Sequence, residues 1–587
     1  MASGSQVRPS RIRYVVLALT TMVAVLLYLD RICLSFAERY VKEDLGITDA
    51  QMALVLSSFF WTYALGQLPA GWLSDRYGAR LMLGLYLAAW SVCTGLLGFA
   101  YGLVILVVLR LGCGLFEAGA YPAAAGVIGK WMPFHRRGLA SGIVSVGGRL
   151  GGAAAPVLTA YLMVAFVPVS SSSLLEPEDL QNCLELFSDL PNKRWSEELT
   201  KIGIPGNPAA IRGALSGPMS NIKSYLAVRV LDHLPKDNAL GQILGAFPNW
   251  SNADLASFAR DLNKILSEAD LLDGIDLSQL DLPDEALRLT QPSRQPLSQK
   301  EIERRNRLVL EAAFPGAIRK VYGAGWRPVM MVYGLAGLVV ACIFWWFFRD
   351  SPRQHPECNV AEIALIEGEQ QLDPKAFKAP LQFTWLLKSW GLWCSSMVQL
   401  LTNFGWVFLI TWFPRYLKDA HDVPLVERGW MVSMPIFVGM GGMFWGGWLT
   451  DYMVGQMGPR WGRSAPLALS RFVVAAAFAA CIFLETPWQA TVVLSMVALG
   501  TDLGTPAIWA YSVDVGGKHV GSVLGWSNMF GNIGAALSPI ILNMIIGPDM
   551  NYPRMFMVCA SAFVLAGMLA LFIDATKPVV PAERLAA

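Results

Sequence analysis

The sequence predicts an all-α membrane protein with twelve transmembrane helices in two six-helix halves, and a small helical soluble insert between helices five and six. Three observations predict this fold: long uncharged apolar runs, a short motif that occurs twice, and a charged stretch between two apolar runs. Hydrophobic residues make up 54% of the 587 residues and charged residues only 15%. Soluble domains usually carry about 25% charged residues, so the composition indicates an integral membrane protein.

The charge and the cysteines exclude several classes of protein. The net charge of +2 comes without a dominant basic patch, so nucleic-acid binding is not expected. The nine cysteines are scattered, several of them in apolar runs, so we expect neither a disulfide framework nor a metal site. No nucleophile, metal cluster or nucleotide loop indicates an enzyme, and no cofactor is expected besides a coupling ion.

Each helix is predicted from an apolar run of about 20 residues, the length that spans a bilayer. The first run follows two arginines and resembles a signal peptide, but it continues into a charged pair without a cleavage site, so we expect a retained helix. The uncharged run 81–109 breaks near residues 98–102 and supplies helix three and the start of helix four. The remaining helices are expected at 14–33, 51–73, 103–127, 138–165, 328–348, 389–414, 429–450, 465–484, 487–512, 520–547 and 555–573.

An even number of helices places both termini on one side of the membrane. Most basic loop residues fall on that side, including Arg11, Arg13, Arg76, Arg136 and Arg460, whereas the opposite short loops hold few. Because basic loops stay in the cytoplasm, we expect cytoplasmic termini and a multi-pass protein of the cell membrane, in bacteria the inner membrane.

An internal repeat supports two halves. Gly71-Trp-Leu-Ser-Asp75 after the second expected helix returns as Gly447-Trp-Leu-Thr-Asp451 after the eighth. Two similar halves are the layout of a transporter whose site lies between them. The two copies lie further apart than six helices require, and the excess falls at 167–324.

The excess segment has a different composition. It holds 17 Lys/Arg and 21 Asp/Glu, with amphipathic stretches at 252–272 and 299–313, so we expect a helical, extracytoplasmic insert. The predicted organisation is helices one to five at 1–166, the insert at 167–324, helix six at 325–350, a cytoplasmic linker at 351–386, the second half at 387–577 and a tail at 578–587.

Charged residues at membrane depth provide the first functional signal. Asp30 and Arg31 end a long apolar run, and Arg110 and Glu117 lie inside another. A spacing of seven residues places Arg110 and Glu117 on one helix face, roughly 10 Å apart along the axis. Such charges are costly in a membrane and persist mainly where they serve function. Two cations with two carboxylates are the groups that a proton-coupled anion carrier needs.

The run Gly71-Trp-Leu-Ser-Asp-Arg-Tyr-Gly-Ala-Arg80 resembles the loop signature of the major facilitator superfamily, and it stands in the corresponding position between helices two and three. The resemblance implies that Asp75 contacts the amino end of helix eleven, where the helix dipole favours a carboxylate. It implies a gating loop that latches the cytoplasmic side, formed by Gly71, Asp75, Arg76, Gly78 and Arg80. The alternative is an ordinary basic loop.

Five further motifs resemble the anion:cation symporter family, which includes bacterial galactonate, glucarate and hexuronate transporters. They are Tyr28-Leu-Asp-Arg31, Phe59-Phe-Trp-Thr-Tyr-Ala-Leu-Gly-Gln67, Arg110-Leu-Gly-Cys-Gly-Leu-Phe-Glu-Ala-Gly-Ala-Tyr-Pro122, Gly325-Trp-Arg327 and Arg349-Asp-Ser-Pro352. The resemblance implies that Arg31 binds the substrate carboxylate and that tyrosines line the site, namely Tyr28 and Tyr63. It also implies that Asp30 and Glu117 couple protons and that Arg110 pairs with Glu117.

The residues themselves support a transport cycle of this kind. An anion entering a low-dielectric cavity needs a cation, and arginine offers a planar two-point fork. Protonation of Asp30 and Glu117 would free Arg31 and Arg110 for the substrate, and deprotonation on the other side would restore the internal pairs. The alternative is a static buried ion pair that fixes helix packing.

Other polar residues at membrane depth extend the candidate site. Arg149 in the fifth helix is interpreted either as a third anion contact, which would suit a dicarboxylate or a larger sugar acid, or as a structural partner of Asp30 or Glu117. Asp502 and Arg471 are expected to pair structurally. The second half is expected to contribute substrate contacts from Asn403, Thr411, Trp412 and Asn528.

The leading hypothesis is import of an organic anion, a sugar acid of the hexuronate, galactonate or glucarate type, by proton symport. Exchange or sodium coupling is an alternative, and so is a transporter-like membrane sensor whose insert binds a partner. We expect a monomer whose partners are the small anion and the lipid bilayer; the sequence does not indicate a protein partner for the insert.

Overall fold

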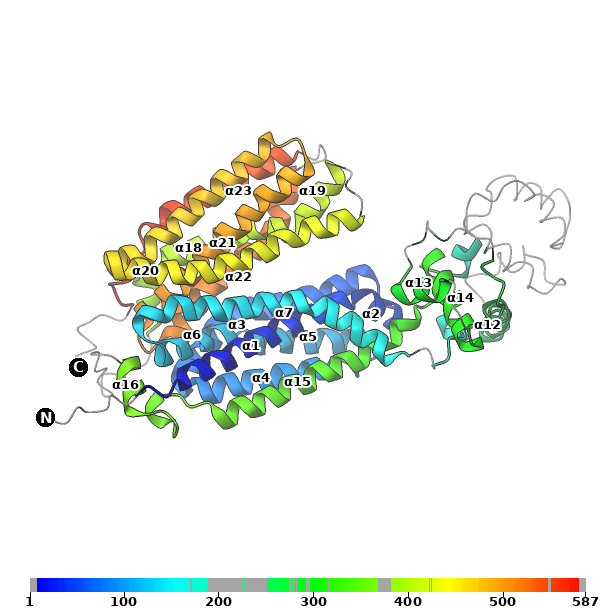
Figure 1. Cartoon of the computed structure of the whole chain (residues 1–587), viewed down its shortest axis with the longest axis horizontal. Coiled ribbons are helices and arrows are strands. Elements are labelled where there is room, and N and C mark those ends of the chain that lie inside the picture. The colour runs from blue at the N-terminus through cyan, green and yellow to red at the C-terminus, as the bar shows by residue number, and fades with distance from the viewer. Residues whose placement is uncertain are drawn as a thin grey trace. The chain divides into compact units, whose positions relative to one another are not determined.

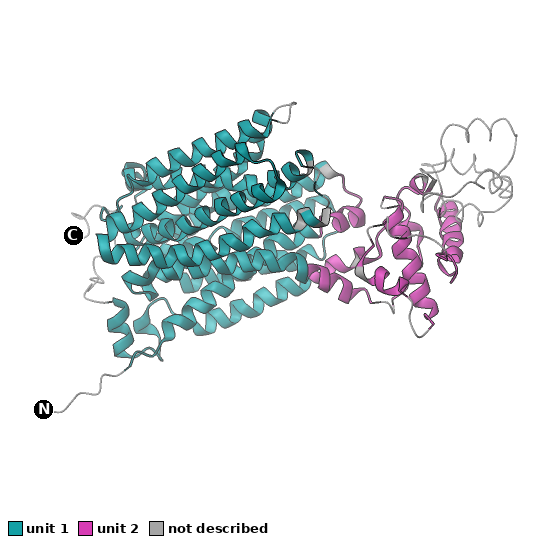
Figure 2. Cartoon of the chain, turned by 45° about the horizontal axis from the view of Figure 1, so that its top comes forward, with its two compact units in different colours: residues 1–36, 49–158, 330–587 teal, residues 37–48, 159–329 magenta. Residues whose placement is uncertain are grey.

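The structure is a computed structural model that divides into two compact units (Figure 2). Unit 1 holds residues 1–36, 49–158 and 330–587, and unit 2 holds residues 37–48 and 159–329. The structure describes residues 8–168, 171–187, 226, 251–273, 277, 280, 282–291, 296–314, 316–367, 382–421, 423, 425–546 and 551–579. Within these residues every regular element is a helix, and one isolated bridge joins Leu180 to Ile318.

The first part of unit 1 consists mainly of long helices. In chain order they are α1 (Ile12–Phe36), α3 (Asp49–Tyr77), α4 (Ala79–Leu97), α5 (Leu103–Glu117), α6 (Ala120–Trp131), η1 (Phe134–Arg136), most of α7 (Arg137–Phe166) and most of α15 (Trp326–Phe347). Unit 2 lies in the chain between α1 and α3 and between α7 and α15. The break expected near residues 98–102 separates α4 from α5. Figure 1 shows these helices running side by side.

The second part of unit 1 begins with the linker between the halves. It contains η5 (Pro352–Gln354), α16 (Val360–Glu367), α17 (Phe383–Lys388), α18 (Trp390–Val407), the π-helical turn η7 (Phe408–Trp412), α19 (Phe413–Asp419), α20 (Leu425–Ala480), η8 (Cys481–Phe483), α21 (Pro487–Gly516), α22 (Val520–Ile546) and α23 (Tyr552–Ala570). α20 covers two of the expected helices. Gly458 has φ 75° inside it, a conformation that favours glycine, and the helical geometry is interrupted there.

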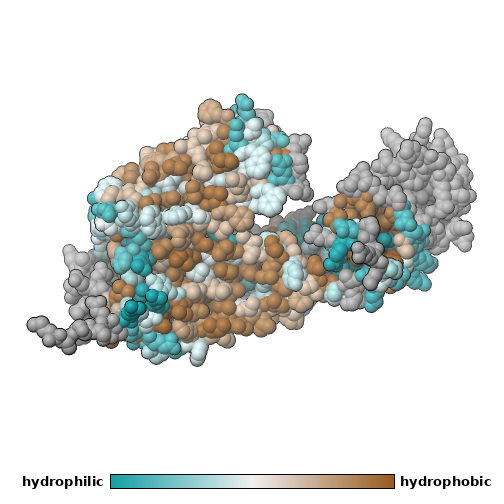
Figure 3. Space-filling model, viewed as in Figure 1, coloured by the Kyte–Doolittle hydropathy of each residue, from teal (hydrophilic) through white to brown (hydrophobic). Residues whose placement is uncertain are grey.

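Ten helices of the described chain are long and apolar enough to cross a membrane. α3 is not among the ten, and the segment Trp430–Phe483 counts once although two helices were expected in it. Apolar residues cover the side of the bundle seen in Figure 3, and hydrophilic residues gather near the end where α1 begins. The structure therefore supports an all-helical membrane fold with about ten spans.

The linker helix α16 fixes the beginning of α1. The carboxylate of Glu362 accepts hydrogen bonds from the Ser10 hydroxyl, the backbone N–H groups of Ile12 and Arg13, and the Arg13 guanidinium. Burial acts to raise the pKa of Glu362, but these bonds outweigh it and hold the pKa below its usual range. This contact caps the helix that carries Asp30 and Arg31.

Unit 2 has its own apolar core. Its elements are α2 (Glu38–Leu45), η2 (Pro177–Asp179), η3 (Cys183–Phe187), α12 (Asn252–Leu266), α13 (Asp284–Thr290), α14 (Gln299–Ala313) and η4 (Val321–Gly325). Capping boxes at Ser251 and Ser298 begin α12 and α14, the two helices expected from amphipathic patterning. Phe258, Leu262 and Leu308 are buried between them.

Candidate functional site

The centre of the site is an ion pair between Arg31 on α1 and Glu117 at the end of α5. Arg31 Nη2 lies 3.1 Å from Glu117 Oε2, and Nε donates to the same oxygen at 3.3 Å. The side chains are 13% and 1% exposed, so the pair is largely shielded from solvent. Glu117 Oε1 is buried without a hydrogen-bond partner in the described residues. The pair therefore leaves one carboxylate oxygen unsatisfied.

Aromatic rings surround the Arg31 guanidinium. Its Cζ lies 4.2 Å from the ring centre of Tyr63 and 5.0 Å from those of Tyr28 and Phe59. Each such cation–π contact contributes about 0.5–2 kcal/mol, more when the cation is desolvated. The structure thus brings together four residues expected in the site, Arg31, Glu117, Tyr28 and Tyr63, and adds Phe59, which sequence reasoning did not single out.

The expected pair between Arg110 and Glu117 is wrong, because Glu117 pairs with Arg31. Arg110 is 1% exposed, and its Cζ lies 4.6 Å from the centre of the Phe59 ring. No ion pair joins it to a carboxylate in the part of the chain that the structure describes. Phe59 therefore contacts both guanidinium groups. A spacing of seven aligns Arg110 and Glu117 along one helix but leaves them about two turns apart, so another helix supplies the nearer cation.

Asp30 does not pair with Arg31 either. Its Oδ2 accepts a hydrogen bond of 3.0 Å from the Trp90 indole on α4, while Oδ1 is buried without a partner among the described residues. A β-carbon added at Gly337 on α15 would lie close to both Ser91 and Asp30. Asp30 therefore faces α4 and α15, whereas Arg31 faces α3 and α5, because successive side chains on a helix diverge by about 100°.

Arg149 on α7 pairs with Asp502 on α21, which lies in the second half. Arg149 Nη2 donates to Asp502 Oδ1 at 2.9 Å, and its Cζ lies 4.1 Å from the ring centre of Trp406. Neither of the expected partners, Asp30 or Glu117, forms this pair. The expected pair of Asp502 with Arg471 is also replaced, since Arg471 donates to the carbonyls of Gly500 and Thr501.

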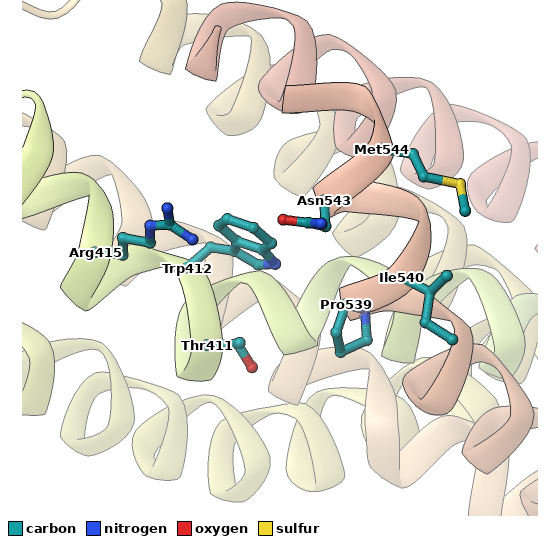
Figure 4. A pocket seen from close by; sticks show the side chains of 7 residues that line it. All are labelled: Thr411, Trp412, Arg415, Pro539, Ile540, Asn543 and Met544. Atoms are coloured by element: carbon teal, nitrogen blue, oxygen red, sulfur yellow. The ribbon is translucent and has the colours of Figure 1, made fainter. Parts of the chain in front are cut away.

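The expected substrate residues of the second half form two groups. Asn528 lies on α22 with Asn403 close to it, and Thr411 and Trp412 line a separate cavity. Asn528 on α22 donates to the Gln67 side chain of α3 at 3.5 Å, and a β-carbon at Gly531 would lie 2.9 Å from the Asn403 amide nitrogen. The other two residues line a cavity of about 490 Å³ beside the π-helical turn (Figure 4). Its lining consists of Thr411, Trp412, Arg415, Pro539, Ile540, Asn543 and Met544. The Arg31 site contributes no residue to this cavity.

The expected gating loop joins the two halves at one end of the bundle. Asp75 accepts hydrogen bonds from the backbone N–H groups of Gly521 (2.8 Å) and Ser522 (2.7 Å), and from the Ser522 hydroxyl (2.6 Å). These donors belong to the first turn of α22. A β-carbon on Gly71 would overlap the carbonyl of Gly521, so only glycine allows this approach.

The rest of the loop packs within the first half. Gly78 has φ 90°, which favours glycine, and the N–H of Arg80 donates to Asp350 at 2.9 Å. The Arg80 guanidinium donates to the Trp345 carbonyl, and Arg76 lies over the Trp72 ring at 5.2 Å. These contacts hold the chain between α3 and α4 in a fixed conformation.

The second copy of the repeated motif makes the equivalent contact, which sequence reasoning did not identify. Asp451 accepts from the N–H groups of Gly138 (2.9 Å) and Leu139 (2.8 Å) at the start of α7, and from Arg463 (2.8 Å). Arg463 also bonds Asp514, which in turn pairs with Arg137. The repeat itself was the signal that could have predicted this second contact.

Comparisons with known proteins agree with this architecture. The sequence profile of the Major Facilitator Superfamily matches residues 20–171 and 312–539. A probable sulfoacetate transporter of Cupriavidus necator is 22% identical over 564 residues, covering 96% of this chain and 94% of the relative. A probable galactarate/D-glucarate transporter of Bacillus subtilis is 22% identical over 98% of this chain and 94% of the relative. A D-galactonate transporter of Escherichia coli is 40% identical over 140 residues, 24% of this chain and 33% of the relative.

The solved structures show the same fold. The crystal structure of the Escherichia coli fucose:proton symporter superposes with a TM-score of 0.54 at 11% identity, covering 96% of this chain and all of that one. The fold and the paired buried charges define a membrane carrier built from two halves. The chain belongs to the Major Facilitator Superfamily. It is thus a transporter homologous to curated sugar-acid transporters, and not an enzyme.

Proposed function

We propose that this protein imports a small organic anion, of the sugar-acid type, by proton symport with alternating access. The observation that carries the proposal is the Arg31–Glu117 ion pair, whose guanidinium contacts three aromatic rings. The full-length relatives named for sulfoacetate and for galactarate or D-glucarate handle small acids with ionised groups. An arginine fork beside tyrosines suits such a carboxylate or sulfonate.

The proposed cycle uses competition for one guanidinium. While Glu117 is ionised it occupies Arg31 and excludes an anion. Protonation of Glu117 removes the competing charge, and the substrate acid group takes its place on Arg31. Releasing the substrate on the other side leaves Arg31 without a counter-ion, which favours deprotonation of Glu117. A buried cation is stable only when paired, so the empty carrier returns with its internal ion pair.

Asp30 and Arg110 have supporting roles in this proposal. Asp30 is a second protonation site that acts through α1, because it contacts Trp90 and not Arg31. Arg110 adds positive charge beside Phe59, which Arg31 also contacts, and becomes available to substrate when Arg31 moves. Tyr28 and Tyr63 line the path of the substrate beside Arg31.

We further propose twelve spans in a monomer of the bacterial inner membrane. α3 adds one span to the ten, and the interruption at Gly458 divides α20 into two. The excess of basic residues in the loops on the side of the termini supports cytoplasmic termini. On this topology the contacts of Asp75 and Asp451 close the cytoplasmic end, as in an outward-facing state. The segment 167–324 lies outside the cytoplasm, and the family profile leaves residues 172–311 unmatched.

The test combines binding with uptake. Thermal unfolding of the purified protein is measured with D-galactonate, galactarate and sulfoacetate, and uptake is measured in liposomes with an inward proton gradient. We expect at least one anion to stabilise the wild type, and Arg31→Ala to abolish binding. Arg353→Ala, at an exposed arginine paired with Glu367, is the matched control and should bind normally.

Glu117→Gln separates symport from its alternatives. The variant keeps a neutral side chain at this position, so we expect exchange of labelled for unlabelled anion to persist while gradient-driven uptake is lost. Uptake by the wild type that follows counter-anion or sodium and ignores the proton gradient would replace symport by exchange or sodium coupling. If no organic anion stabilises the wild type, the proposal is wrong.

A further inference from the structure

Arg149 and Asp502 form the second arginine–carboxylate pair of the site, and it resembles the first in one respect. In both pairs a carboxylate leaves one oxygen without a partner among the described residues, Oε1 of Glu117 and Oδ2 of Asp502. A fully satisfied pair would use both oxygens in a two-point fork. The Nε of Arg149 is also buried without a partner. Both arginines therefore hold single-oxygen contacts that another acid group could replace.

The same two tyrosine rings lie near both arginines. Arg31 lies 5.0 Å from the centre of the Tyr28 ring, whose centre is 6.3 Å from that of Tyr121. A β-carbon at Gly148, next to Arg149, would contact the Tyr28 ring and overlap the Tyr121 hydroxyl. Tyr28 and Tyr121 thus connect the Arg31 end of the site to the Arg149 end. A ligand that reached both cations would lie along these rings.

Arg471 is a second cation near Asp502, and both residues belong to the second half. It is fully buried on α20, and its Nη1 contacts the carbonyls of Gly500 and Thr501, the two residues before Asp502. Its Nε and Nη2 have no partner in the described part of the chain. A buried guanidinium with unsatisfied N–H groups gains stability when a carboxylate approaches. Asp502 therefore has one arginine of each half near it.

We propose that Arg149 is a specificity residue that exchanges Asp502 for a second acid group of the substrate, while Arg471 receives Asp502. This inference rests on the proposed function, in which Arg31 holds the first acid group. It predicts a preference for substrates with two acid groups over the corresponding monoacids. It also links binding to movement, because the exchange removes an ion pair that joins the two halves.

Galactarate and D-galactonate form a matched pair of ligands, since they differ only at one end, where galactarate has a carboxylate and galactonate a hydroxymethyl group. Binding of each to the purified full-length protein is measured by thermal shift and by titration at pH 7. We expect the wild type to bind galactarate more tightly. Arg149→Gln should raise the Kd for galactarate about 10- to 100-fold, as for loss of a hydrogen bond to a charged group. The Kd for galactonate should change less than about threefold.

Asp502→Asn provides a test of opposite sign. It removes the competitor for Arg149, so galactarate should bind several-fold more tightly, whereas a static structural bridge predicts equal losses for both ligands. Where Arg149→Gln alone does not fold, the charge-balanced double variant Arg149→Gln/Asp502→Asn makes the same comparison and should lose the preference for galactarate.

Three results overturn the inference: no preference in the wild type, equal weakening of both ligands in Arg149→Gln, or no change in either. In each of them galactonate binding to the wild type still supports the proposed function. If neither sugar acid binds the wild type but sulfoacetate does, the inference fails and the proposed function stands. If none of the three anions binds, both fail, so the two failures are distinguishable.

Discussion

The two copies of the repeated motif make the same contact with different chemistry. Asp75 caps the start of α22 with hydrogen bonds from Gly521 and Ser522, and no arginine or lysine forms an ion pair with it in the described residues. Asp451 caps the start of α7, and it also belongs to a chain of ion pairs through Arg463 and Asp514. One contact between the halves is therefore made by hydrogen bonds and the other by an ion network.

The difference indicates that the two copies of the motif have different roles when the halves move. A carboxylate that accepts hydrogen bonds from backbone N–H groups at a helix start is released when that helix moves. It is then solvated by water, and no buried cation loses its counter-ion. A carboxylate in an ion network cannot leave without exposing a buried arginine. We therefore expect the Asp75 contact to open more readily than the Asp451 contact.

The largest effect is expected at Arg463, which is fully buried and bonds Asp451 and Asp514 together. Arg463→Gln leaves two carboxylates short of a cation and should destabilise the protein by about 3–5 kcal/mol in thermal or denaturant unfolding. Arg460→Gln is the control, since Arg460 is 55% exposed and 4.0 Å from Asp574, and it should change stability by less than about 0.5 kcal/mol. Similar effects of the two variants would contradict the ion-network interpretation.

The comparison is tested directly by the same substitution in both copies. Both variants lose a charge at a helix start and weaken its hydrogen bonds, but Asp451→Asn also leaves Arg463 with a single counter-ion. We expect Asp75→Asn to destabilise by about 1–3 kcal/mol and Asp451→Asn by more, measured as the difference in unfolding free energy. Equal losses would show that the ions around Asp451 contribute nothing beyond the helix cap.

The smallest effect is expected at the Ser522 hydroxyl. Ser522→Ala removes one of three donors to Asp75 and leaves both backbone N–H groups, so the loss should be about 0.5–1.5 kcal/mol. Ser561→Ala is the matched control, because Ser561 is exposed and bonds only the Met557 carbonyl of its own helix. A loss at Ser522 as large as that in Asp75→Asn would mean that the hydroxyl carries most of the contact.

The sequence predicts the helices well because apolar runs are local. The run 520–547 becomes α22 (Val520–Ile546), and the turn near residues 98–102 separates α4 from α5. The number of spans does not follow from such runs alone. Gly458 interrupts one long element without ending it, and α3 carries polar residues that lower its mean hydropathy.

Pairing of charges was predicted poorly, because sequence spacing reports one helix at a time. Arg110 and Glu117 share a face of α5, but the nearest cation to Glu117 comes from α1. Asp30 and Arg31 are neighbours in sequence and face different helices. Arg149 pairs with Asp502, which lies 353 residues further along the chain. Only the packing of the two halves brings these two residues together. Site residues can thus be nominated from sequence, whereas their partners need the fold.

The glycine crossings at the two motifs have a geometric consequence. A β-carbon at Gly71 would overlap the Gly521 carbonyl, and one at Gly447 would lie 2.7 Å from the Gly138 carbonyl. A single methyl group at either crossing acts as a wedge between the halves. A substitution that only adds side-chain volume at Gly71 or Gly447 can therefore shift the balance between outward-facing and inward-facing states. Every charged group stays in place in such a variant.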